Sequence, residues 1–208
     1  MQAILDSLMA QHRDLSVLIG LLERQPSLEP DPAASHVGLL VDVLEYLTNF
    51  PDVSHHPLED RMAERLVARN ALDTQLCEEL EAQHARLARQ GADLLRDMEG
   101  AMRRETVSLE LVALNARLYA ERLRHNIAFE ELVLFPAAAK HLDAADWQAI
   151  AASVGAAAAD PLFSGAVDQR FAQLHRVIAA EASCECEPAS SPFIRRPPYS
   201  APGAPPRR

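Results

Sequence analysis

The chain has 208 residues, enough for one domain with a substantial core and a tail. Its formal net charge of −10 argues against nucleic acid as a main partner, because phosphate binding needs a basic surface. No apolar run reaches the roughly 18 residues of a membrane span. Residues 1–6 show neither the basic nor the apolar region of a signal peptide. The chain has only three cysteines, Cys77, Cys184 and Cys186, so we expect a reducing, cytoplasmic location.

Apolar residues recur at helical spacing over four long stretches. The first covers about residues 3–23, and the third begins near Asp73, which fits an N-cap. The second starts near residue 35, is interrupted by Pro51 and resumes near residue 54, with Pro57 in a first helical turn. The fourth begins between residues 106 and 108 and runs to about residue 141, with Pro136 expected to bend its last turns. The pattern predicts an all-α fold, an up-down-up-down four-helix bundle over residues 1–142.

Two shorter helices are predicted after the bundle, over residues 144–159 and 161–182, and they form a helical extension of residues 143–182. From residue 183 onward proline, serine and arginine dominate, which predicts a disordered tail over residues 183–208. Cys184 and Cys186 fall in this tail, and we interpret them as inert rather than as a metal or redox site.

Each long stretch carries ionisable residues near the middle of its apolar pattern. Burying such groups is unfavourable unless they are paired or bind a metal. The residues are His12 on the first stretch, His55 and Glu59 on the second, His84 on the third, and His125 and Glu130 on the fourth. Because the middles of the helices in such a bundle share one level, we expect these side chains to converge.

The spacing of these residues points to metal chemistry. His55 and Glu59 are four residues apart, so they share one face of a helix. An imidazole and a carboxylate so placed can bind one metal ion while the second carboxylate oxygen reaches a neighbouring ion. Four imidazoles and two carboxylates suit two first-row ions such as iron, zinc or manganese. His56 and Asp60 are also four residues apart, so the spacing leaves open which pair faces the core.

The residues resemble the haemerythrin-like, HHE cation-binding family. The matching segments are residues 11–15, 55–60, 81–84 and 125–136, and the resemblance spans about residues 3–140. It implies a four-helix bundle with two non-haem iron ions (Fe2+/Fe3+) that an oxo or hydroxo group can bridge. It favours His55 with Glu59 over His56 with Asp60. The implied ligands are His12, His55, His84 and His125, with Glu59 and Glu130 bridging the two irons.

The fourth stretch departs from the family pattern. Most bacterial members place histidine and glutamate four residues apart, whereas Asn126 is four residues before Glu130 here and His125 is five before it. Five residues of regular helix turn two side chains about 140° apart. We therefore predict a π-bulge between Tyr119 and Glu130 that brings His125 to the side of Glu130. A regular helix there, with His125 turned outward, would contradict this prediction.

The resemblance implies activities that include reversible O2 binding, O2 or iron sensing, and defence against nitrosative stress. We interpret the chain as a di-iron protein that binds or senses O2, NO or a peroxide. One alternative is a di-iron enzyme that reduces peroxide or NO, and another is a metal-free helical module that recruits partners. Members that repair iron centres carry an additional cysteine-containing domain before the first helix. This sequence shows no such segment, which disfavours the repair activity.

Overall fold

A computed structural model describes residues 2–24, 36–103, 105–153, 160–163 and 166–184 of the chain. Within these ranges every regular element is a helix and no strand occurs, so the predicted all-α fold is confirmed. In the same part of the chain, no helix combines the length and apolarity needed to cross a membrane.

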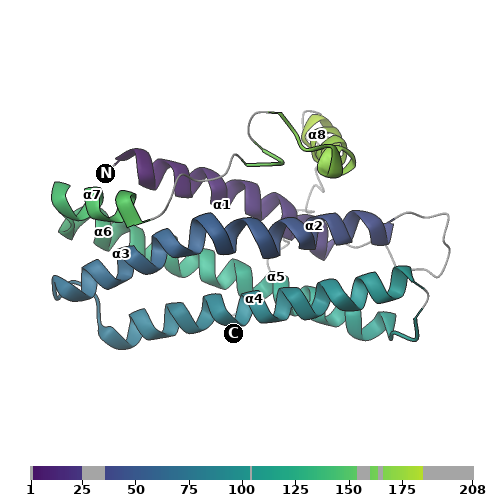
Figure 1. Cartoon of the computed structure of the whole chain (residues 1–208), viewed down its shortest axis with the longest axis horizontal. Coiled ribbons are helices and arrows are strands. Elements are labelled where there is room, and N and C mark those ends of the chain that lie inside the picture. Colours follow the sequence, from purple (N-terminus) through teal and green to yellow (C-terminus); the bar gives the residue numbers. More distant parts are fainter. Residues whose placement is uncertain (1, 25–35, 104, 154–159, 164–165, 185–208) are drawn as a thin grey trace, which may run out of the picture.

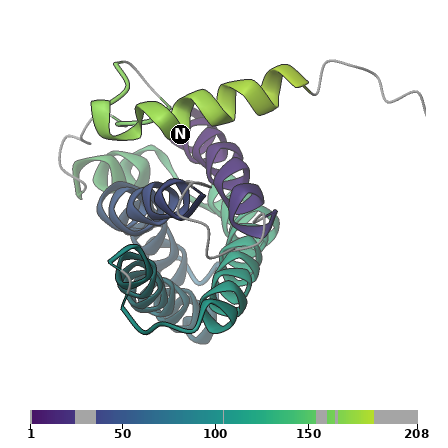
Figure 2. The ribbon, with the colours of Figure 1, turned by 90° about the vertical axis from the view of Figure 1, so that its right-hand side faces the viewer.

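Four antiparallel rods make up the bundle (Figure 1). The first is α1 (Gln2–Glu23), and the second joins α2 (His36–Phe50), the π-helical segment η1 (Pro51–His55) and α3 (His56–Ala68). The third is α4 (Thr74–Met102), and the fourth joins α5 (Leu109–Phe129), the π-helical segment η2 (Glu130–Leu134) and α6 (Phe135–His141). Figure 2 looks along the rods and shows them as a ring. The predicted up-down-up-down order is confirmed.

Local sequence signals explain where several of these helices begin. The Asp73 side chain accepts a hydrogen bond from the backbone N–H of Gln75 at 2.7 Å and caps α4 as predicted. Pro51 starts η1, where the missing N–H removes one link of the α-helical ladder. Pro57 lies in the first turn of α3, where that N–H would have no partner anyway.

The extension after the bundle differs from the prediction in one segment. Helix α7 (Ala144–Ser153) packs against α3, and α8 (Ala172–Cys184) packs against α2. The predicted helix over residues 161–182 is wrong in its first half. The Asp160 side chain accepts hydrogen bonds from the backbone N–H groups of Leu162 and Phe163, which forms a turn instead. Helical structure begins with a short 3-10 turn, η3 (Gln169–Phe171). Residues 154–159 of the other predicted helix and residues 185–208 of the predicted tail lie outside the described ranges.

The interior consists of two apolar cores with a polar zone between them. On α1, Leu8 belongs to one core and Leu15 to the other, and His12 lies between them. On α4, Leu80 and Leu87 flank His84 in the same way. We name the two cores by their leucines: the Leu8 core and the Leu15 core. The polar residues at mid-height therefore interrupt an interior that is apolar on both sides.

Candidate metal centre

Seven buried polar side chains cross the bundle between the two cores, and none of them is more than 6% exposed. This polar layer consists of His12, His55, His56, Glu59, His84, Asn126 and Glu130. It draws residues from all four rods, and it includes five of the six predicted ligands. The predicted convergence of these five is thus observed, while their binding of a metal stays a prediction.

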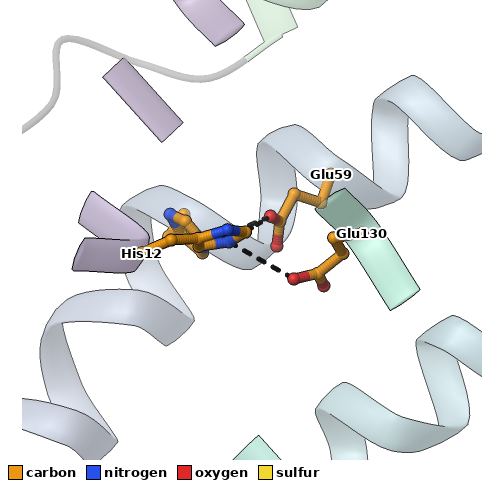
Figure 3. Close-up of side chains that lie close together, drawn as sticks. His12, Glu59 and Glu130 are labelled. Atoms are coloured by element: carbon orange, nitrogen blue, oxygen red, sulfur yellow. Dashed lines mark hydrogen bonds and ion pairs between the residues drawn. The ribbon is translucent and has the colours of Figure 1, made fainter. Parts of the chain in front are cut away.

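One group of donors surrounds a point that we call position 1. The Nε2 atom of His12 lies 3.3 Å from an oxygen of each carboxylate, Oε1 of Glu59 and Oε2 of Glu130 (Figure 3). The same atom lies 3.0 Å from Nε2 of His55. His55 Nε2 lies 3.1 Å from the same Glu59 oxygen. Neighbouring donors that bind one first-row ion at about 2.0–2.2 Å stand about 2.8–3.1 Å apart in octahedral geometry and about 3.3–3.6 Å apart in tetrahedral geometry. These four separations are therefore close to those that such an ion requires.

A second group of donors defines position 2. The Nε2 atom of His84 lies 3.1 Å from Glu130 Oε1 and 3.7 Å from Glu59 Oε2. The ring of His56 stacks on the ring of His84 with 4.1 Å between centroids. Ligand atoms of His56, Glu59 and His84 lie within 4.8 Å of one another. Each glutamate therefore turns one oxygen toward each position, which is the arrangement that a bridging carboxylate needs.

Three of the imidazoles are held by acceptors outside the layer. In each, the Nδ1 atom faces a side-chain oxygen, so an N–H at this atom donates outward and the Nε2 atom faces the layer. The pairs are His12 with Glu131 (3.0 Å), His55 with Gln11 (2.7 Å) and His84 with Asp60 (2.8 Å). Proteins commonly orient metal-binding histidines in this way.

The carboxylates of the layer are left with few partners. Both oxygens of Glu59 and Oε2 of Glu130 are buried and have no hydrogen-bond partner. Buried carboxylate oxygens without partners are unfavourable, and a bound cation would satisfy all three. His12 Nε2 and His55 Nε2 lie at a hydrogen-bond distance of 3.0 Å, so one of them carries a proton that a bound cation would replace. The donor set therefore fits a pair of metal ions.

In the metal-free protein, protonated imidazoles balance the negative charges of the carboxylates in the layer. Burial alone would lower the pKa of His12, but the nearby Glu130 and Glu59 carboxylates outweigh it and raise the pKa to about 10. The pKa of His84 also rises to about 10, because Asp60 and Glu130 outweigh the same effect of burial. Burial pulls the pKa of Glu59 upward, yet the neighbouring imidazoles of His55 and His12 bring it below its usual range. A metal ion that binds in this layer would therefore have to displace protons.

His125 is not part of the layer, so the prediction that its side chain converges with the other five is wrong. Helix α5 stays regular through Phe129, and the π-helical segment lies at Glu130–Leu134 rather than between Tyr119 and Glu130. Five regular residues leave His125 about 140° from Glu130, and its side chain is exposed. The buried position one turn before Glu130 belongs to Asn126.

His56 is the imidazole that the sequence reading did not include in its main ligand set. Spacing offered either His55 with Glu59 or His56 with Asp60, but the structure buries both histidines together with Glu59. Because successive residues on a helix point about 100° apart, His55 reaches position 1 and His56 reaches position 2. The signal in the sequence was Pro51, since a change of helical phase just before two adjacent histidines allows both to face inward.

Comparison with known proteins gives one match. A family model described as the hemerythrin HHE cation binding domain matches residues 3–138, a range that includes every residue of the polar layer. No curated protein and no solved structure matched the chain.

Proposed function

The chain belongs to the haemerythrin HHE cation-binding domain family, and on this basis we propose that it is a non-haem di-iron protein that binds O2, NO or a peroxide. Family membership supports cation binding. The identity of the cation as iron, the number of two ions and the small ligand are our proposal. Imidazole and carboxylate donors in the core of a helical bundle are the ligands that such iron pairs use.

In this proposal, position 1 is held by His12 and His55, and position 2 by His56 and His84. Glu59 and Glu130 bridge the two. An iron pair, when bound, supplies redox chemistry and an open coordination position for a small ligand. The protein keeps the surroundings dry, because the polar layer lies between two apolar cores and the ring of Phe135 stacks on His12 with 5.2 Å between centroids.

One observation carries the proposal: three carboxylate oxygens without a hydrogen-bond partner lie buried among four imidazoles, and side-chain oxygens outside the layer hold the Nδ1 atoms of three of these imidazoles. A metal-free interaction module gains nothing from this arrangement, because buried charges with incomplete partners destabilise a fold. A bundle that binds two cations uses every one of these atoms.

Anaerobic loading with Fe2+ tests the proposal. Metal-free protein is incubated with excess Fe2+ and desalted, and the iron per chain is measured before O2 or NO is added. We expect about two irons per chain and new near-ultraviolet absorption after the ligand is added. His12→Ala should reduce the iron content, whereas His125→Ala, which changes an exposed histidine, should not. Wild-type protein that takes up no iron would refute the proposal.

A stopped-flow measurement separates a binding protein from an enzyme. The iron-loaded chain is mixed with excess peroxide or NO, and consumption of the small molecule is followed together with the optical spectrum. We expect one spectral change per iron pair without repeated consumption. Many turnovers per chain would instead support the enzyme.

A further inference from the structure

Asn126 is the only member of the polar layer that is neither a histidine nor a glutamate, and it is 1% exposed. Its Nδ2 group donates a hydrogen bond to Glu130 Oε1 at 2.7 Å and lies 3.4 Å from His84 Nε2. The other three carboxylate oxygens of the layer have no hydrogen-bond partner. The amide therefore holds the Glu130 oxygen that faces position 2.

The two positions are unequal in their donor distances. At position 1, His12 Nε2 lies 3.0 to 3.3 Å from the donors of His55, Glu59 and Glu130, and His55 Nε2 lies 3.1 Å from Glu59 Oε1. At position 2, His84 Nε2 lies 3.1 Å from Glu130 Oε1 but 3.7 Å from Glu59 Oε2, the widest of these separations and slightly beyond the about 3.6 Å that a tetrahedral first-row ion sets between its donors. Position 1 therefore needs less rearrangement than position 2 to bind an ion.

Asn126 limits how position 2 contracts. The hydrogen bond from Asn126 to Glu130 Oε1 is 2.7 Å long, shorter than the distances from this carboxylate to His84 Nε2 (3.1 Å) and His12 Nε2 (3.3 Å), so it contributes most to fixing the rotation of the carboxylate. A neutral amide orients the oxygen without adding charge to a layer that already holds two carboxylates. Loss of such an orienting partner typically weakens metal binding about 10- to 100-fold.

We propose that Asn126 is a positioning residue for position 2 and that the centre fills in order, position 1 first and position 2 second. The inference rests on the proposed function in that both positions must bind cations. Ordered filling produces a stable state with one cation. Two different divalent ions can then be placed in one chain by adding them in sequence.

The test is an anaerobic titration of the metal-free, full-length chain with Co2+, followed by calorimetry and visible absorption. Wild-type protein should bind two Co2+ ions in two steps whose dissociation constants differ by about 10-fold or more. Asn126→Ala and Asn126→Leu should weaken the second step about 10- to 100-fold and leave the first unchanged. Asn115→Ala, which changes an exposed asparagine on the same helix, is the matched control and should behave as wild type.

The outcomes separate this inference from the proposed function. Two equal steps in the wild-type protein, or an Asn126 variant that weakens both steps equally, would overturn the inference while the chain still binds two cations. A wild-type chain that takes up no Co2+ would contradict the proposed function itself. Asn126→Leu keeps a branched side chain in the layer, so an unchanged first step in this variant shows that the bundle has kept its fold. Where neither variant folds, the wild-type titration still decides the order of filling.

Discussion

The apolar cores and the polar layer contribute to the molecule in opposite ways. Leu18 and Leu80 are fully buried, and burial of each such side chain stabilises the fold by about 1.5–3 kcal/mol. Glu59 is just as deeply buried, yet neither of its oxygens has a hydrogen-bond partner, which is unfavourable. The cores therefore hold the bundle together, and they hold the layer in a geometry that it would not adopt alone. Substitutions in the two regions should consequently have different effects.

The largest effect is expected from Glu59→Ala. One oxygen of Glu59 faces position 1 and the other faces position 2, so the variant removes a donor from both. Iron content after anaerobic loading should fall from about two ions per chain to nearly none, by the bridging geometry of such sites. The control is Glu64→Ala on the same helix, because Glu64 is exposed and pairs with Arg61. Retention of two irons by the Glu59 variant would show that the layer is not the metal site.

A substitution in an apolar core should lower stability and leave iron binding unchanged. Leu18→Ala leaves a cavity in the Leu15 core and should lower the free energy of unfolding by about 2–5 kcal/mol, measured by urea denaturation. The folded variant should still bind as much iron as the wild-type protein. If the variant unfolds at the same urea concentration as the wild-type protein but loses its iron, the assignment of stability to the cores and of metal binding to the polar layer would be contradicted.

The stability of the metal-free protein should depend on pH because of the ionisable groups in the polar layer. The raised pKa values of His12 and His84, about 10 against 6.5, give a contribution to stability that is complete below pH 6.5 and is lost as the pH rises toward 10. The lowered pKa of Glu59 gives a contribution that is present above its ordinary value of 4.5 and is lost in more acidic solution. The Tm of chelator-treated protein should therefore decrease from pH 6.5 upward. A Tm that increases from pH 6.5 upward would contradict the pairing of protonated His12 and His84 with the carboxylates.

The smallest effect is expected from His125→Ala. The side chain is exposed and lies outside the polar layer, so the free energy of unfolding should change by less than about 0.5 kcal/mol. Iron content should also be unchanged. A clear loss of iron in this variant would restore the ligand role that the sequence assigned to His125.

The sequence predicted the parts of the site that lie on uninterrupted helices. His12 on α1 and His84 on α4 follow the regular 3.6-residue period, and both occupy the polar layer as expected. Around Glu130 the prediction was partly wrong, because the π-helical segment η2 contains neither proline nor glycine to mark it. A shift of helical phase by one residue decides whether Asn126 or His125 occupies the buried position one turn before Glu130. Periodicity alone does not locate such a shift.

Other features of the site depend on contacts between rods and could not be predicted from periodicity. Gln11 and Glu131 hold the Nδ1 atoms of His55 and His12, and neither pair is close in sequence. The unpartnered oxygens of Glu59 become evident only when every neighbouring donor has been located. Pro51 did indicate the first change of phase, and it accounts for the burial of both His55 and His56.

Anomalous diffraction at the iron edge from crystals of the iron-loaded chain is the most direct test of the central claim. The account predicts two peaks inside the polar layer, about 3.5–4 Å apart as in other two-metal sites. One peak should lie between His12 and His55, and the other beside His84. Peaks elsewhere on the protein, or a layer without iron in crystals that contain it, would contradict the account.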